Sequence, residues 1–201
     1  VLHAQMDKID ASDVLEQLNL TEHEYFVVSA HREENINSDT NFKNLIDSLN
    51  KIAKVYDMPI LVSTHPRTRI MIEKTGIHVD ERVILSKPLG FVDYVKLQKH
   101  AKAVLSDSGT ISEESSILGF KALNLREAHE RPEAMEEASV MMVGLHYERI
   151  LQGLKVLETQ DKDTLRLVSD YSMPNVSEKV LRIILSYTDY VNRNVWKKEG
   201  K

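Results

Sequence analysis

Short apolar runs alternate with longer amphipathic segments along this chain, and this alternation limits the folds that it can adopt. The apolar runs predict strands at 25–30, 59–63, 83–85, 103–106, 122–125 and 139–143, and helical periodicity lies between them at 42–56, 66–74, 91–100, 110–118 and 132–138. Strands that alternate with helices form βαβ units, which build a parallel sheet covered by helices on both faces. We therefore predict a doubly wound, Rossmann-like α/β fold, in which ligands lie beyond the carboxyl ends of the strands.

The stretch after residue 147 has a different pattern. It is mostly helical, with a polar loop or linker predicted at 158–176 and a last helix from 177 to about 194. Ser38 or Asp39 is the expected cap of the helix at 42–56.

A turn of small residues at 107–110 joins the fourth predicted strand to a helix. The first N–H groups of a helix lack internal partners and the helix dipole attracts negative charge, so this turn can bind an anion. Ser108 adds a hydroxyl donor, Gly109 lets a phosphate approach the backbone, and Glu114 can accept hydrogen bonds from ribose hydroxyls. These residues predict a phosphate held next to a sugar. The alternative is an ordinary strand-to-helix turn with serine as the helix cap.

Two other motifs follow predicted strands: His-Arg-Glu-Glu-Asn at 31–35 and Arg-Glu-Ala-His-Glu-Arg-Pro-Glu at 126–133. With the Asp-Ser-Gly-Thr-Ile-Ser-Glu-Glu motif at 107–114, and in this order, they resemble the non-hydrolysing UDP-N-acetylglucosamine 2-epimerase family. The resemblance is close over residues 25–145 and looser elsewhere. It implies a two-domain fold of the glycosyltransferase-B type, whose C-terminal half carries these motifs.

The resemblance also implies a domain organisation. We expect residues 1–22 to be an interdomain connection, residues 23–175 a Rossmann-like UDP-binding domain, and residues 176–201 a helix that packs toward an N-terminal domain outside this chain. The chain begins with Val rather than Met, which fits the second half of a longer enzyme. We expect the full-length enzyme to be a homodimer.

The activity implied by the resemblance is inversion of C2 in a UDP-linked N-acetyl sugar, by elimination and re-addition of UDP, for surface polysaccharide precursors. The family's acid/base carboxylates belong to the N-terminal half, so we expect this chain alone to be inactive. No cofactor is implied. Glu33, Thr110 and Ser112 replace Arg, Gly and Gln of the family motifs, and one candidate is the branch that forms UDP-N-acetyl-L-fucosamine.

His31 is the one catalytic residue that the resemblance implies here, as a helper for the leaving phosphate. Arg32 suits phosphate pairing. The alternative is a loop histidine that is tied to Glu33, with Arg32 as a surface charge. His65 ends the second predicted strand and is a substrate-binding candidate, although a solvent-facing turn histidine is the alternative.

Two further residues are implied to contact the nucleotide. Tyr94 matches the spacing of an aromatic residue that packs on uracil in the family, but Tyr94 and Phe91 can equally pack in the core. Arg131 precedes Pro132, which favours a helix start, and an arginine at this position can reach a phosphate.

Composition and missing motifs exclude several other functions. A net charge of −5 disfavours a nucleic-acid surface, and no apolar run approaches the roughly 20 residues of a membrane helix. The lack of cysteines fits a cytoplasmic protein. No Gly-x-Gly-x-x-Gly or Walker motif occurs, and the histidines show no metal-ligand spacing, so we expect no metal. The competing functions are the nucleotide-sugar half of a glycosyltransferase and a stand-alone nucleotide-binding module.

Overall fold

The computed structural model of the chain describes residues 1–36, 38–64, 66–128, 131–160 and 167–198. It contains two compact units, Val1–Val168 and Ser169–Lys201.

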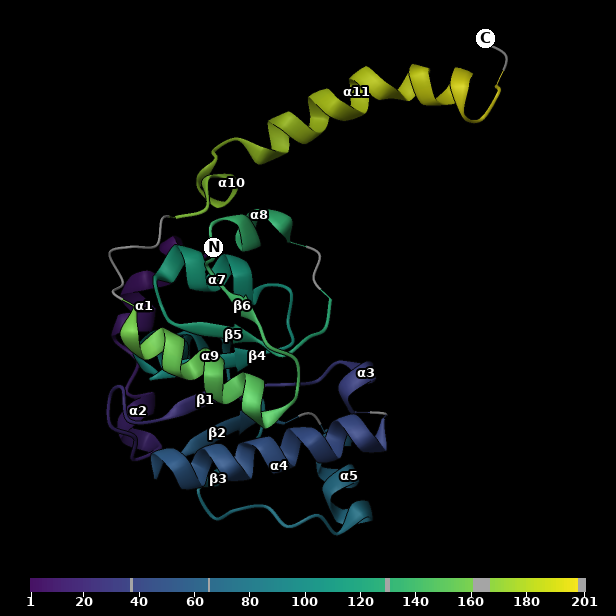
Figure 1. Cartoon of the computed structure of the whole chain (residues 1–201). Helices are drawn as coiled ribbons and strands as arrows, with labels where there is room; N and C mark the ends of the chain where they lie inside the picture. Colours follow the sequence, from purple (N-terminus) through teal and green to yellow (C-terminus); the bar gives the residue numbers. More distant parts are fainter. Residues whose placement is uncertain (37, 65, 129–130, 161–166, 199–201) are drawn as a thin grey trace. The chain divides into compact units, whose positions relative to one another are not determined.

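The first unit is built around a parallel sheet of six strands (Figure 1). The strands are β1 (Phe26–Ser29), β2 (Ile60–Ser63), β3 (Val83–Ser86), β4 (Ala103–Ser106), β5 (Ala122–Asn124) and β6 (Met141–Met142). Their order is β3-β2-β1-β4-β5-β6, and every neighbouring pair is parallel. The chain leaves β1 toward β2 and β3 on one side and returns to β4 on the other. The prediction of a doubly wound, Rossmann-like α/β fold is therefore confirmed.

Helices connect these strands, in most cases where the sequence predicts them. They are η1 (His3–Gln5), α1 (Met6–Asp10), α2 (Val14–Gln17), α3 (Glu33–Ile36), α4 (Asp39–Tyr56), α5 (Pro66–Thr75), α6 (Phe91–His100), α7 (Ile111–Leu118), α8 (Pro132–Glu136) and α9 (Tyr147–Thr159). The predicted cap of α4 is Ser38, whose hydroxyl accepts a hydrogen bond from the Asn41 N–H at 3.3 Å.

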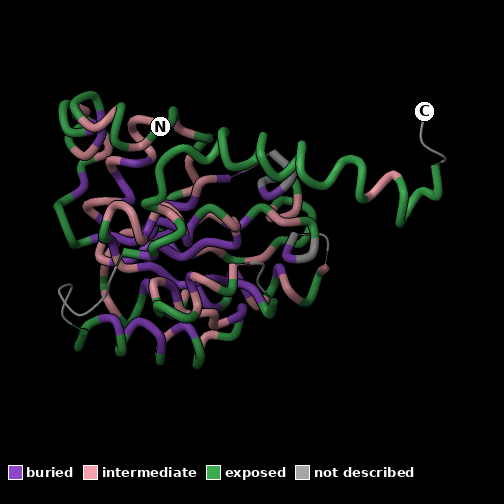
Figure 2. The backbone as a smooth tube through the Cα atoms, turned by 90° about the horizontal axis from the view of Figure 1, so that it is seen from above, coloured by how far each residue is buried: buried purple, intermediate pink, exposed green. Residues whose placement is uncertain are grey.

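Alternate residues of each strand pack on opposite faces of the sheet. Phe26 and Val28 of β1 join a buried cluster with α4 and α9, whereas Val27 joins a second cluster with α2, α6 and α7. Because both faces are buried, the strands are almost wholly apolar. Figure 2 shows this buried interior.

Residues 1–22 form helices, for which the sequence analysis assigned no elements. Ile9 of α1 and Val14 of α2 are buried, and both helices contact α6. The Lys99 ammonium of α6 also lies 2.7 Å from the Asp10 carboxylate. This N-terminal segment is therefore packed onto the sheet domain.

The second unit consists of α10 (Ser169–Ser172) and α11 (Val176–Asn194). α11 is amphipathic, yet most of its residues are exposed (Figure 2). The exposed apolar residues include Val180, Ile184 and Tyr187. Within the described residues, no helix combines the length and apolar character needed to cross a membrane.

Candidate functional site

Five neighbouring strands end in a polar residue at the same edge of the sheet. Ser29 pairs with Ser63 on one side and with Ser106 on the other, Ser63 pairs with Ser86, and Ser106 pairs with Asn124. This carboxyl edge is where a doubly wound sheet binds its ligands. The in-register pairing brings the loops that follow β1, β4 and β5 together, although they are far apart in the sequence.

Asp107 joins two of these loops. Its side chain is completely buried, and its Oδ2 accepts hydrogen bonds from the backbone N–H groups of His31 at 3.0 Å and Arg32 at 2.9 Å. The side-chain amide of the buried Asn35 donates to the same oxygen at 3.0 Å. The His31–Asn35 loop is thus held against the start of the 107–110 turn. Asp107 and Asn35 lie within the sequence motifs, but neither was predicted as a site residue.

The imidazole of His31 lies at the mouth of this junction. Its Nδ1 is 3.3 Å from the Ser29 hydroxyl and 3.6 Å from Asp107 Oδ1, and 51% of the side chain is exposed. One ring nitrogen therefore faces the protein, and the ring remains accessible to a ligand. Arg32 is partly buried beside it.

The turn at 107–110 leads directly into α7. The Ser108 hydroxyl lies 3.0 Å from the Thr110 hydroxyl, and the cap position of α7 is Thr110, which makes no side-chain cap bond. Gly109 has no left-handed backbone angle. A Cβ added there would meet no atom closer than the Arg131 Nη2, at 4.0 Å. The space above Gly109 is therefore open, and a guanidinium borders it.

Arg131 is fixed in place from α7. Its Nε donates to Glu113 Oε1 at 2.9 Å, and both side chains are partly exposed. This ion pair joins the start of α8 to the first turn of α7. A cation thus stands beside the helix N-terminus, an arrangement that attracts an anion.

Glu114 is held by α6 rather than by its own helix. The Gln98 amide donates to Glu114 Oε2 at 2.7 Å, and Gln98 is buried, with 1% exposed. Gln98 was not predicted as a site residue, because its contact joins two helices and leaves no local pattern in the sequence. This contact leaves the other carboxylate oxygen of Glu114 for a further partner.

Tyr94 lies one turn before Gln98 on α6. Its ring packs against the buried cluster of α2, α6 and α7, as one of the two alternatives predicts, whereas Phe91 is exposed. Burial raises the pKa of the Tyr94 phenol to about 12, opposed in part by a hydrogen bond with Ser29. Stacking of Tyr94 on a base stays a prediction.

His65 lies outside the described residues. Among the residues that are described, no group of three or more acidic or histidine side chains is arranged to hold a metal ion.

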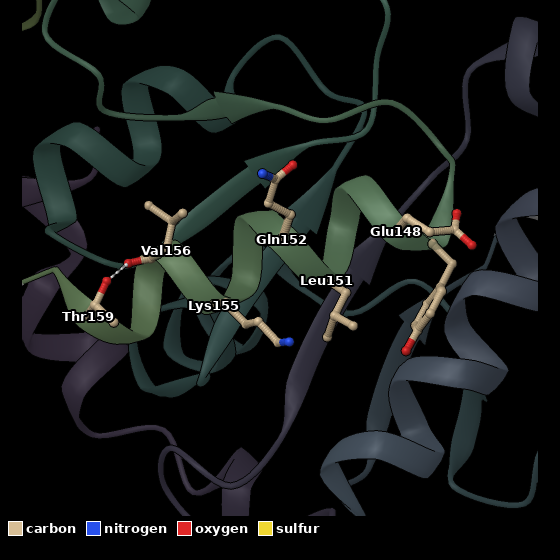
Figure 3. A pocket seen from close by; sticks show the side chains of 7 residues that line it. Glu148, Leu151, Gln152, Lys155, Val156 and Thr159 are labelled. Atoms are coloured by element: carbon tan, nitrogen blue, oxygen red, sulfur yellow. Dashed lines mark hydrogen bonds between the residues drawn. The ribbon is translucent and has the colours of Figure 1, made fainter.

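A hollow of about 410 Å³ lies elsewhere, along α9 (Figure 3). Its lining residues all belong to this one helix: Tyr147, Glu148, Leu151, Gln152, Lys155, Val156 and Thr159. A single helix face offers no opposing wall and no converging polar groups, whereas the carboxyl edge has both a helix N-terminus and paired charges. We therefore place the candidate site at the carboxyl edge.

Comparison with known proteins adds to this geometry. A sequence profile described as UDP-N-acetylglucosamine 2-epimerase matches residues 1–185. This chain belongs to the UDP-N-acetylglucosamine 2-epimerase family. The resemblance seen in the three motifs is therefore confirmed.

Individual 2-epimerases agree with this assignment. The solved UDP-N-acetylglucosamine 2-epimerase of Rickettsia bellii is 44% identical, with a TM-score of 0.80 over 98% of this chain and 53% of that chain. The enzyme of Neisseria meningitidis, solved with UDP-GlcNAc bound, is 26% identical, with a TM-score of 0.72 over 92% of this chain and 52% of that chain. The curated 2-epimerase of Methanocaldococcus jannaschii is 27% identical over 171 residues, which are 83% of this chain and 46% of that protein. The chain thus spans about half the length of the 2-epimerases that it matches.

Proposed function

We propose that this chain is the nucleotide-binding half of a UDP-N-acetylglucosamine 2-epimerase and that it binds UDP at the carboxyl edge of the sheet. The observation that carries the proposal is the open space above Gly109, which lies at the N-terminus of α7 and is bordered by Arg131. Backbone N–H groups and a guanidinium are the donors that a pyrophosphate requires.

The rest of the nucleotide fits the neighbouring helices. One carboxylate oxygen of Glu114 accepts a hydrogen bond from Gln98, and the other accepts one from a ribose hydroxyl. Tyr94, on the same helix as Gln98, contacts the uracil. Ser108, Arg32 and His65 are the remaining residues that we propose bind the UDP-sugar. Support comes from the Neisseria meningitidis relative, which was solved bound to UDP-GlcNAc.

The proposed reaction of the whole enzyme inverts C2 of the sugar. A base removes the C2 proton as the bond from C1 to the UDP oxygen breaks, which yields UDP and an unsaturated sugar. UDP then adds back at C1 while C2 receives a proton on its opposite face. The chain's part is to stabilise the departing diphosphate, with His31 donating to its oxygen. The base lies in the other half, so this chain alone does not epimerise.

Other features belong to the same proposal. The exposed apolar face of α11 packs onto the N-terminal half of the enzyme, and this contact buries its apolar side chains away from water. The full-length protein is a cytoplasmic homodimer that serves surface polysaccharide synthesis, and formation of UDP-N-acetyl-L-fucosamine is a candidate for its specific reaction.

A calorimetric titration tests the ribose contact. Glu114→Ala should weaken the binding of UDP more than the binding of a UDP analogue that lacks the ribose hydroxyls. Only UDP can donate a ribose hydrogen bond to the Glu114 carboxylate. Equal losses for the two ligands would remove Glu114 from the site.

A glycosyltransferase is the second candidate, because the glycosyltransferase VinC, solved with DTDP, shares the fold with a TM-score of 0.54 at 11% identity. An assay of the full-length protein with and without sugar acceptors separates the two. Acceptor-independent conversion of the UDP-sugar supports the epimerase, whereas acceptor-dependent transfer supports the glycosyltransferase.

A further inference from the structure

Asp107 is a buried carboxylate for which the proposed function has no use. None of its side chain is exposed, so its charge is removed from water, which is costly unless hydrogen bonds compensate. The compensation comes from donors of the His31–Asn35 loop: two backbone N–H groups at 2.9 to 3.2 Å and the Asn35 amide at 3.0 Å. Asp107 thus determines where this loop lies relative to the phosphate turn.

The same carboxylate faces the imidazole of His31. Asp107 Oδ1 is 3.6 Å from Nδ1, and the Ser29 hydroxyl is 3.3 Å from the same nitrogen. A negative charge favours a proton on the nitrogen that faces it. The carboxylate thus favours the neutral ring with its proton on Nδ1, and in the doubly protonated ring Nε2–H, on the other side, is the donor that faces a ligand.

Both effects act on one residue, because the carboxylate anchors the His31 backbone and also orients its ring. We propose that Asp107 is the positioning residue for His31, holding the imidazole with Nδ1 toward the protein and Nε2 toward the bound diphosphate. The value of this arrangement for catalysis rests on the proposed function, whereas the hydrogen bonds to Asp107 are features of the chain itself. Asp107 does not touch the reacting atoms.

The tautomer of His31 tests the proposal directly. In the 201-residue chain labelled with ¹⁵N-histidine, long-range ¹H–¹⁵N spectra at a pH where the histidines are neutral report which ring nitrogen is protonated. The His31 signals are assigned by their loss in His31→Ala. We expect the Nδ1–H tautomer in the native chain and its loss in Asp107→Asn, because the amide oxygen would keep the three N–H donors and the amide N–H would then face Nδ1, which has to accept it. Persistence of the Nδ1–H tautomer in folded Asp107→Asn would overturn the proposal.

Two variants separate Asp107 from other causes. Ser29→Ala removes the other group near Nδ1, and the Nδ1–H tautomer should survive it; its loss there would assign the orientation to Ser29 instead. Asp80→Asn is the matched control, because Asp80 is also buried, at 7% exposed, but bonds to Arg82 at the start of β3. It should leave the His31 signals unchanged, and a change there would show that the tautomer reports general destabilisation.

If Asp107→Asn does not fold, Asn35→Ala decides the matter. It removes one anchor and keeps the carboxylate, so the Nδ1–H tautomer should persist, and its loss would contradict the proposal.

In the full-length enzyme, Asp107→Asn should lower kcat about 100-fold with little change in KM, the scale expected when a catalytic group is misplaced. A loss confined to KM would count against positioning of His31. Failure of the native chain to bind UDP would refute the proposed function and leave the tautomer result intact.

Discussion

Replacing Gly109 with alanine should weaken UDP binding without lowering the stability of the fold. The native Gly109 has no left-handed backbone angle, and an added Cβ meets nothing closer than the Arg131 guanidinium at 4.0 Å. The fold should therefore accept the methyl group. Stability should be unchanged or should rise by about 0.4–1 kcal/mol, because alanine restricts the unfolded chain.

The same methyl group should hinder binding of the diphosphate. It occupies the space through which we propose that a phosphate oxygen reaches the backbone N–H groups. Loss of one hydrogen bond to a charged group costs about 1.5–3 kcal/mol, which corresponds to roughly 10- to 100-fold in affinity. Uridine, which lacks phosphate, should bind the variant and the native chain equally.

The measurements are thermal unfolding and calorimetric titration of both ligands. Native-like unfolding with unchanged UDP affinity would refute the placement of the diphosphate above Gly109. An equal loss of UDP and uridine binding would show that the methyl group disturbs the site as a whole.

Three further outcomes are expected. In the full-length enzyme, His31→Ala should lower kcat far more than it changes KM, because a group that acts on the leaving oxygen contributes mainly in the transition state; steady-state kinetics check this, and a change in KM alone would make His31 a binding residue. Gly153→Ala should destabilise the chain by about 1–3 kcal/mol in urea unfolding, because the added Cβ would lie 3.0 Å from a Leu123 methyl group, and unaltered stability would mean that the core yields there. Hydrogen bonds from Arg82 hold the pKa of Asp80 well below its ordinary value of 3.8, so this contribution to stability is present above pH 3.8 and is lost as pH falls below it. Urea unfolding at pH 7 and pH 3 should therefore show a smaller acid-dependent loss for Asp80→Asn than for the native chain, and an equal loss would contradict this.

Most of the sheet could be predicted from sequence because its signals are local. Residues 25–30 and 103–106 are short apolar runs, and the structure places β1 and β4 within these ranges. β6 is shorter than predicted, with only Met141 and Met142 in the ladder. Residues 1–22 were harder to predict, because α1 and α2 are too short for a clear periodic pattern and are stabilised by contact with α6.

The supporting residues of the site were missed for a related reason. Asp107 bonds to backbone groups 75 and 76 positions earlier, and Gln98 bonds to Glu114 on another helix. Such contacts arise only when the sheet is assembled. The polar residues that end the strands, from Ser29 to Asn124, nevertheless lie at or within one residue of the end of each predicted apolar run and could have indicated the functional edge.

The central claim is that UDP binds at the carboxyl edge of the sheet, and ¹H–¹⁵N spectra of the chain titrated with UDP test it most directly. We predict saturable shifts centred on the backbone of Gly109 and the first turn of α7, extending to α6 around Tyr94. Shifts confined to α9 around Tyr147 and Val156, or no saturable shift anywhere, would contradict the claim.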